Sequence, residues 1–446
     1  MKYVHDHSHH EKQETWFMVL YVAILVFGAV INFILNQHIA TELGAVRYGD
    51  FSIAARMLNF LGIISVLGFS YFVPVELPRV ANRNLKQGAG LIISLFRILR
   101  PVMLFILFAG VVLLPLLFFA KYNKTLSMFE DSHPFMYFVW AIPVFGLYKY
   151  CRSIISSLGL GVLAFVLDTL LLPILTFALF FFLVKEHVTT EQLMFAPIIA
   201  ALFGLLFLVV FFVVYFKRKH VALMSTQYNV NKVEVIKVSA TLMIASYFVT
   251  QDTTLALLVT EIFGKNEESV GFVAACFSCL GATVYCVMGS LTMILVPKLS
   301  QLLHQSNYKA SAQKYLTRTH ITCGAIATLM CAGIYVYAPQ LLAGFGAEFK
   351  GNQIPITMLH FYVATLFPLF FIYYIDITVQ ARKENAFIAL NVAIWYCVLV
   401  VLLAIPLVYY LHGFGAIVTI VIAQFVYYIF YIAVLYRREG LKPLSL

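Results

Sequence analysis

Long apolar stretches recur along the whole chain and limit its fold more than any other feature of the sequence. Each has about 20 residues or more, the length that an α-helix needs to cross a hydrocarbon core about 30 Å thick. Because lipid supplies no hydrogen-bond partners, the backbone of such a stretch must pair within itself, which makes each stretch a helix. Twelve spans are predicted in this way: 16–36, 53–75, 101–120, 135–157, 161–184, 194–216, 238–260, 270–296, 319–342, 356–380, 386–410 and 414–435.

The composition agrees with a membrane protein. Hydrophobic residues make up 62% of the chain and charged residues 11%, and the mean hydropathy is +0.92. Soluble domains are about 45–50% apolar and about 25% charged, so a soluble enzyme, a nucleic-acid-binding module and a disordered scaffold are excluded. We attribute the net charge of +10 to Lys and Arg in cytoplasmic loops and expect no nucleic-acid partner. The predicted fold class is an all-α polytopic membrane protein, with membrane lipids as its surroundings.

The Lys and Arg residues fall mainly on one side of the predicted membrane. With a cytoplasmic N-terminus, 23 of the 30 lie in cytoplasmic segments, six lie on the opposite side, and Arg56 lies within a span. Positively charged loops remain in the cytoplasm, so both terminal tails, 1–14 and 437–446, are expected there. We expect the first span to be a transmembrane helix and not a cleaved signal, since no small-residue cleavage site follows it.

Short segments repeat at a constant offset of 219 residues, close to half the chain length. The aligned pairs are 41–43 with 260–262, 61–62 with 280–281, and 77–82 with 296–301. Six spans per copy return the chain to its starting side, so both copies enter the membrane in the same sense. The sequence therefore predicts two parallel six-helix lobes, 15–220 and 238–436, joined by a cytoplasmic linker at 221–237.

Polar residues within the spans mark the candidate substrate site, because a charge in the membrane is costly and needs a reason. Arg56 and Asp252 are predicted at similar depth, and Asn32, Asn36 and Gln251 at the same height. Asn32 and Gln251 are equivalent at the 219-residue offset. A guanidinium suits the oxygens of a phosphate, so this set is interpreted as lining a cavity that holds an anionic headgroup.

Each of these residues also has a simpler interpretation. Arg56 and Asp252 can also be interpreted as a packing pair whose charges neutralise each other. Asp252 can further be interpreted as a counter-charge that releases substrate or as a group that carries a proton. Arg79 and Lys298, at the inner ends of the second and eighth spans, form either a basic cytoplasmic mouth or part of the ordinary positive-inside bias.

Two further acids within spans, Asp168 and Asp376, are interpreted as contacts within or between lobes.

No enzyme chemistry is expected. The seven cysteines show no disulfide or zinc pattern, and the pair Cys276 and Cys279 has no second ligand pair nearby, so no metal site is predicted. The sequence has no phosphate-binding glycine loop, metal-ligand helix pair or hydrolase triad. We therefore expect neither catalytic residues nor a cofactor, and an energy source in an ion gradient or in removal of the product.

Several motifs resemble a known family. The segments 43–51 (LGAVRYGDF) and 66–69 (VLGF) are similar to the opening pattern of the polysaccharide flippases of the multidrug/oligosaccharidyl-lipid/polysaccharide exporter (MOP) superfamily. In the second lobe, Phe263-Gly264, 270–272 and 296–300 are similar to that pattern, and Ile405-Pro406 with 413–416 (GFGA) resembles the family's last turn. The resemblance covers nearly the whole chain.

This resemblance implies a twelve-helix exporter of the bacterial inner membrane. Such a protein moves a lipid-linked oligosaccharide, such as an O-antigen unit on undecaprenyl diphosphate, to the outer leaflet for surface polysaccharide biosynthesis. Its expected partners are the glycan substrate and the polymerase and chain-length machinery.

The alternatives are an ion-coupled multidrug antiporter of the same superfamily and a peptidoglycan lipid-precursor flippase. The first span lacks the carboxylate on which the drug antiporters commonly depend, since 16–36 contains no Asp or Glu.

Overall fold

The computed structural model describes residues 2–123, 133–183, 189–219, 231–246, 248–281, 308–371 and 386–439, together with 221, 228 and 284. Nearly all of these residues are helical, and no strand occurs among them. The chain divides into two compact units, one formed by Glu42–Leu258 and the other by Met1–Thr41 with Val259–Leu446. Each unit is described by itself, and the lobe boundaries predicted from the sequence stay a prediction.

Eight helical stretches in the described parts of the chain are long and apolar enough to cross a membrane. They are Ala23–Ser65, Leu85–Leu117, Pro134–Leu183, Thr190–Arg218, Gln313–Ala343, Gln353–Phe371, Leu390–Leu411 and Gly413–Val434. Two of them, Ala23–Ser65 and Pro134–Leu183, each cover most of two predicted spans. The predicted span 238–260 corresponds to shorter helices, and the span 270–296 begins in the apolar helix Glu268–Gly281. The prediction of an all-helical membrane protein with about twelve helices is confirmed.

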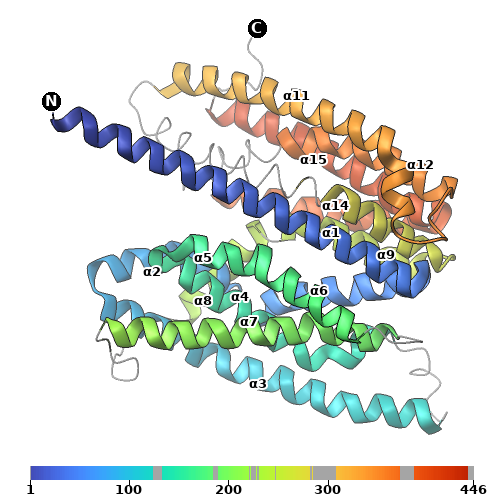
Figure 1. Ribbon diagram of the computed structural model, residues 1–446, viewed down its shortest axis with the longest axis horizontal. Helices are drawn as coiled ribbons and strands as arrows, with labels where there is room; N and C mark the ends of the chain where they lie inside the picture. The colour runs from blue at the N-terminus through green and yellow to red at the C-terminus, as the bar shows by residue number, and fades with distance from the viewer. Residues whose placement is uncertain are drawn as a thin grey trace. The chain divides into compact units, whose positions relative to one another are not determined.

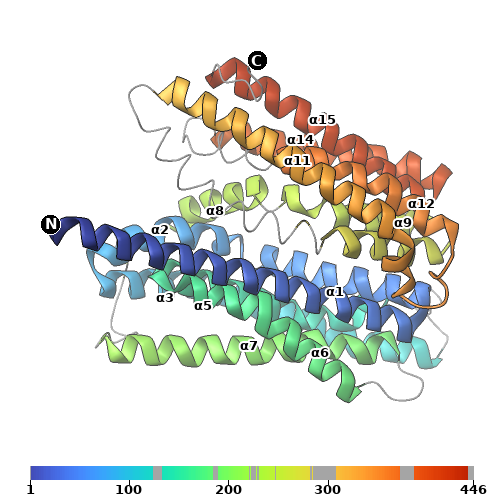
Figure 2. The same cartoon turned by 45° about the horizontal axis from the view of Figure 1, so that its top comes forward.

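The unit Glu42–Leu258 contains the second part of α1 (Lys2–Ser65) and the helices that follow it in Figures 1 and 2. These helices are α2 (Phe69–Arg83), α3 (Leu85–Asn123), η2 (Pro134–Ala141), α4 (Ile142–Ile155), η3 (Ser156–Leu160), α5 (Gly161–Val166), η4 (Leu167–Leu171), α6 (Leu172–Leu183), α7 (Thr190–Arg218), α8 (Lys232–Ser246), η6 (Phe248–Gln251) and the start of α9 (Asp252–Phe263). Buried side chains of α2, α3 and α4 form its main core, among them Phe69, Leu77, Leu95 and Ile154.

The predicted span 53–75 is interrupted, which corrects the sequence analysis. Leu67 and Gly68 have φ values of 53° and 70°, and they separate α1 from α2. A side chain on Gly68 would lie 2.6 Å from the carbonyl oxygen of Ser239 and 2.7 Å from Cβ of Met243. Only glycine permits this close approach of the chain to α8, so the break is fixed by packing.

A hairpin lies inside the stretch Pro134–Leu183. In a straight helix, with a rise of about 1.5 Å per residue, Lys149 and Asp168 would be about 28 Å apart, yet their side chains form an ion pair of 3.0 Å. The chain therefore reverses between them. The reversal lies at Gly159, whose φ of 84° is left-handed, within the π-helical turn η3. This turn joins α4 to α5 and lies between the two predicted spans 135–157 and 161–184.

The other unit combines the start of α1 with the C-terminal part of the chain. It contains α11 (Tyr308–Ala343), α12 (Gln353–Tyr362), η7 (Val363–Thr365), α14 (Ala386–Leu411) and α15 (Gly413–Glu439), in addition to Glu268–Gly281. The helices α14 and α15 run side by side (Figures 1 and 2).

The start of α1 is tied to the end of α11 within this unit. The Gln37 amide donates to the Leu341 carbonyl at 3.1 Å, and the Thr41 hydroxyl donates to the Gly344 carbonyl at 3.3 Å. The helix α1 then breaks at Gly44, whose φ is 76° and ψ 173°. The break falls 219 residues before Phe263, where α9 ends, so it matches the offset of the sequence repeat.

Candidate functional site

The predicted residue Arg56 contacts the first turn of α9. Its Nη1 donates a hydrogen bond of 3.1 Å to the hydroxyl of Thr253, which is 197 residues away in the sequence. The backbone amide of Thr253 in turn donates to Oδ1 of Asp252 at 2.7 Å. Asp252 is buried, and its carboxylate lies at the helix start, where a negative charge is stabilised by free amides and by the helix dipole. The structure thus brings Arg56 to the residue that follows Asp252.

The predicted amides are used locally. The Gln251 amide donates to the Thr250 hydroxyl, and its oxygen accepts from the Thr254 hydroxyl, both at 3.1 Å. The Asn36 amide donates to the Asn32 carbonyl one turn earlier, at 2.7 Å, and the Asn32 side chain is exposed. Gln251 belongs to the same unit as Arg56, whereas Asn32 and Asn36 belong to the other unit. Their joint role in one site stays a prediction.

Of the two residues predicted to form the cytoplasmic mouth, the structure describes Arg79. The Arg79 side chain is 58% exposed and lies 3.7 Å from the Glu76 carboxylate, one turn earlier on α2. An exposed pair of this kind contributes little to stability, so it leaves the guanidinium accessible. The predicted partner Lys298 lies outside the described residues, as does Asp376.

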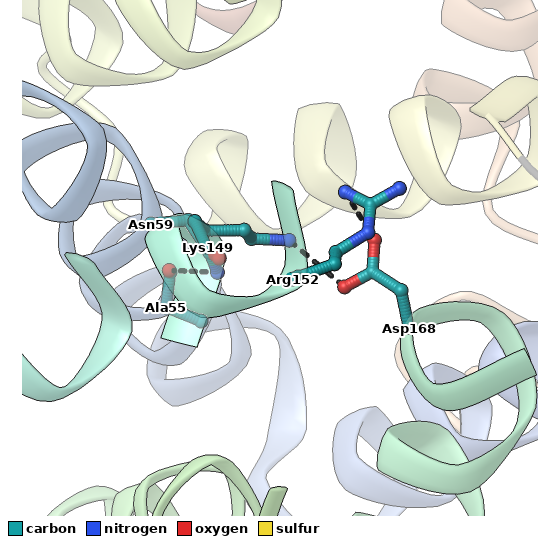
Figure 3. A network of polar contacts seen from close by, with 5 residues as sticks. All are labelled: Ala55, Asn59, Lys149, Arg152 and Asp168. Atoms are coloured by element: carbon teal, nitrogen blue, oxygen red, sulfur yellow. Dashed lines mark hydrogen bonds and ion pairs between the residues drawn. The ribbon is translucent and has the colours of Figure 1, made fainter. Parts of the chain in front are cut away.

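A cluster of three charged side chains lies within the stretch Pro134–Leu183 (Figure 3). Lys149 Nζ lies 3.0 Å from Oδ1 of Asp168, and Arg152 Nη1 lies 3.0 Å from Oδ2. Both carboxylate oxygens are thus engaged, each by a different cation. Lys149 and Arg152 are three residues apart on α4, which places them on one face of the helix. Asp168 comes from the π-helical turn η4 on the other arm of the hairpin.

This cluster has one more positive than negative charge. Asp168 is the only carboxylate of the described part of its unit that pairs with Lys149 or Arg152. The side chains are 22%, 35% and 15% exposed for Lys149, Arg152 and Asp168, so the two cations are the more accessible members. An excess charge in a membrane-spanning segment is costly, which makes this cluster a candidate functional site. The arrangement can attract a further anion.

This cluster was not predicted from the sequence. Lys149 and Arg152 were counted among the 23 cytoplasmic Lys and Arg residues, and Asp168 was interpreted as a contact within or between lobes. A signal was present, because Lys149 lies ten residues before Gly159 and Asp168 nine residues after it. In an antiparallel hairpin, residues at equal distances from the turn lie at the same height. The charges of adjacent spans therefore could have been paired from the sequence once the turn was located at Gly159.

A second basic–acidic contact lies outside the predicted spans, at the start of η2. His133 Nε2 is 3.9 Å from Oδ1 of Asp50, while His133 Nδ1 accepts a hydrogen bond of 3.1 Å from the Phe135 amide. Burial lowers the pKa of His133 to about 4. The Phe135 hydrogen bond acts in the same direction, since it requires an unprotonated Nδ1. His133 is therefore neutral at pH 7, and its role is to cap η2.

The cysteine pair Cys276 and Cys279 is fully buried in Glu268–Gly281. The Cys276 thiol donates to the carbonyl of Pro355 at 3.5 Å. A buried thiol with a backbone partner fits a packing role.

Comparisons with known proteins identify the fold. No protein-family model matches the sequence, and no curated protein matches it. Among solved structures, the chain is similar to an inward-facing multidrug resistance MATE family transporter of the MOP superfamily. The identity is 14%, the match covers 95% of this chain and 99% of that one, and the TM-score is 0.71.

Two other solved structures extend this similarity. The lipid II flippase MurJ, in an inward closed conformation, has 13% identity, coverage of 94% of this chain and 87% of that one, and a TM-score of 0.61. A MOP superfamily transporter from Pyrococcus furiosus, described as having a binding pocket of reverse polarity, has 15% identity, coverage of 94% and 95%, and a TM-score of 0.60. The chain thus has the fold of the MOP superfamily transporters, a multi-pass membrane fold with about twelve helices. The structural neighbours are transporters and flippases and not enzymes.

Proposed function

We propose that this protein is a flippase for a lipid-linked oligosaccharide, moving a glycan on undecaprenyl diphosphate across the bacterial inner membrane by alternating access. The observation that carries the proposal is the excess positive charge of Lys149, Arg152 and Asp168 within a membrane-spanning hairpin. A diphosphate headgroup supplies the negative charge that this hairpin lacks, whereas a cationic drug would be repelled. The fold similarity to MurJ, described as a lipid II flippase, supports a lipid-linked substrate.

Arg56 is assigned the second contact to the headgroup. Its guanidinium is half-buried and donates to the hydroxyl of Thr253. A guanidinium carries its N–H donors in a planar fork, whose geometry matches the oxygens of a phosphate group. Gln251 and Asp252 lie beside this contact, and Asn32 and Asn36 are predicted to face the same substrate. Arg79 and Lys298 are proposed to recruit the headgroup from the cytoplasmic leaflet.

Two other functions fit the same fold. A multidrug antiporter is favoured by the similarity to the MATE family transporter, which has a TM-score of 0.71. A flippase for a peptidoglycan lipid precursor is favoured by the similarity to MurJ. The absence of Asp and Glu from 16–36 speaks against the antiporter. The two flippases share the diphosphate and differ in the glycan, so the glycan has to be measured.

Deletion of the gene separates these functions. Lipids of the deletion strain are extracted, and carrier-linked oligosaccharide is quantified together with surface polysaccharide and drug sensitivity. We expect accumulated carrier-linked oligosaccharide, lost surface polymer and unchanged drug sensitivity. Unchanged glycans with increased drug sensitivity would support the antiporter, and accumulation of a peptidoglycan precursor with cell lysis would support the other flippase. Both termini are expected in the cytoplasm, and polymerase and chain-length proteins are expected partners.

A further inference from the structure

We propose that Lys149 and Arg152 form a binding site for a phosphate-type anion, and that Asp168 occupies this site when no ligand is present. The inference deepens the proposed function and rests on it for the source of the anion, a lipid diphosphate. It assigns to Asp168 the role of a built-in competitor, and to the hairpin Pro134–Leu183 the role of the binding element.

The first argument is the geometry of the carboxylate. Asp168 presents two oxygens on one carbon, and each of them meets a different cation at 3.0 Å (Figure 3). A phosphate group also presents several oxygens on one atom, so it fits the same two donors. Arg152 supplies a planar guanidinium, which matches phosphate oxygens in a fixed geometry, and Lys149 supplies a point charge.

The second argument is charge. One carboxylate neutralises one of the two cations, so the cluster with Asp168 in place keeps a charge of +1. A doubly charged phosphate group would neutralise both cations, which is favoured at low dielectric when the displaced Asp168 carboxylate turns to water or takes up a proton. The cations are also more exposed than the carboxylate, at 22% and 35% against 15%, so an incoming anion reaches them first.

The third argument is the backbone around Asp168. Its segment Leu167–Leu171 is a π-helical turn, and the preceding turn Ser156–Leu160 is also π-helical, with Gly159 at a φ of 84°. Single π-helical turns are frequent at functional sites. Asp168 is therefore carried on an irregular arm that is joined to the cations through an irregular turn. Movement of this arm would withdraw the carboxylate without unfolding α4.

The test is binding of inorganic pyrophosphate to the purified full-length protein in lipid nanodiscs, measured by calorimetry. Removing the competitor in Asp168→Asn should tighten binding about tenfold, which corresponds to about 1.4 kcal/mol. Lys149→Gln and Arg152→Gln should each weaken binding about tenfold. The matched control is Arg97→Gln, an exposed arginine on α3, which removes the same charge and should leave the affinity unchanged.

A second comparison protects the test against misfolding of Asp168→Asn. In the background Lys149→Gln, whose cluster is neutral, the added change Asp168→Asn restores the cluster charge of +1 that the wild type has. This double variant should bind pyrophosphate more tightly than Lys149→Gln alone. Weaker binding upon loss of Asp168 in both backgrounds would overturn the proposal, because Asp168 would then orient the cations and not compete for them. Unchanged binding in Lys149→Gln and Arg152→Gln would overturn it as well.

A prenyl diphosphate distinguishes the sources of the anion. Farnesyl diphosphate and additional pyrophosphate are each titrated as competitors of bound pyrophosphate. If farnesyl diphosphate competes at the lower concentration, the site takes a lipid headgroup. Equal displacement supports the anion site with a soluble phosphate compound as its ligand. The binding experiment and the deletion experiment can fail separately. Normal glycan export together with the predicted binding pattern would contradict the proposed flippase function and still support the anion site.

Discussion

The two compact units place polar groups within their spans in different ways. In Glu42–Leu258, Lys149 and Arg152 meet Asp168, and Arg56 reaches Thr253, so formal charge dominates. Rings stack on one another in both units, as they do along α7 of Glu42–Leu258, but in the other unit two histidines of the described spans take part. His320 stacks on Phe371 at 4.0 Å between ring centroids, and His360 stacks on Tyr335 at 3.9 Å.

The sequence repeat sharpens this difference. At the 219-residue offset, Arg152 corresponds to Phe371, so a guanidinium in one copy is replaced by a ring in the other. Among the described residues, the ion pairs within spans lie in Glu42–Leu258, so we expect charge recognition in this unit and mainly effects on stability at the stacked histidines of the other.

The largest effect is expected at Arg56. A hydrogen bond to a charged group contributes about 1.5–3 kcal/mol, so loss of the headgroup contact in Arg56→Ala should lower glycan export about 10- to 100-fold. Arg56→Lys should keep part of the export, because it retains the charge. Surface polysaccharide is measured at matched protein level. Wild-type export by Arg56→Ala would remove Arg56 from the substrate site.

The next effect is the coupling within the cluster. Buried partners in one network couple by about 0.5–3 kcal/mol, so we expect about 2 kcal/mol between Asp168 and Lys149. The variants Asp168→Asn, Lys149→Gln and their combination are compared by equilibrium unfolding in mixed detergent micelles. The same cycle for Arg56→Ala and Thr253→Val should give less than about 1 kcal/mol, because one partner is neutral. Equal coupling in both cycles would break the distinction between a charge cluster and a polar contact.

The contact of His133 with Asp50 tests whether a short distance between a basic and an acidic side chain is enough to make an ion pair. Burial holds the pKa of His133 at about 4, below the usual 6.5, so the unfolded chain binds more protons than the folded one between these values. Stability is therefore fully present above pH 6.5 and is lost as the pH falls toward 4, by about 3 kcal/mol. Unfolding midpoints at pH 7 and 4.5 are compared with those of His133→Gln, whose loss should be smaller. An equal loss of stability at low pH in the wild type and in His133→Gln would show that the burial of neutral His133 is not the cause.

A smaller effect is expected at the turn of the hairpin. Gly159 has a φ of 84°, and a side chain there would meet nothing within 4 Å, so Gly159→Ala tests the backbone conformation alone. We expect a loss of about 1 kcal/mol. The control is Gly333→Ala in α11, which also meets nothing and has no positive φ, and which should gain about 0.5–1 kcal/mol. A gain at both glycines would show that the turn is not held at Gly159.

The smallest effect on transport is expected at the stacked histidines of the other unit. Phe371→Leu removes the ring that stacks on His320 and should cost about 1 kcal/mol of stability. Export should change less than twofold, because the substrate charge is read elsewhere. Unfolding and surface polysaccharide are measured on the same variant. A loss of export larger than that of Arg56→Ala would move the recognition of substrate to this unit.

The sequence was sufficient for the spans because a lipid environment imposes one rule on every segment. A run of about 20 apolar residues must be a helix, so the predicted span 194–216 lies inside α7, and 386–410 and 414–435 lie inside α14 and α15. The break at 66–68 could not be predicted in the same way. It depends on the close approach of Gly68 to Ser239, which is a contact between distant parts of the chain.

The candidate site could be predicted in part. Arg56 stands out because it is a lone arginine in an apolar run, but its contact with Thr253 joins residues 197 positions apart and follows from no spacing rule. Lys149 and Arg152 were missed because the positive-inside rule explains any cation near a span end. Their pairing with Asp168 depends on the location of the turn, and Gly159 is one of several glycines in that region.

The most direct test of the central claim is transport by the purified protein in proteoliposomes with two substrates of opposite charge. One is an undecaprenyl-diphosphate oligosaccharide whose leaflet is read by an added glycosidase, and the other is the cationic dye ethidium. The account predicts that the diphosphate lipid is flipped and ethidium is not moved, and that Arg152→Gln slows the flipping. Transport of ethidium without flipping of the diphosphate lipid would contradict it.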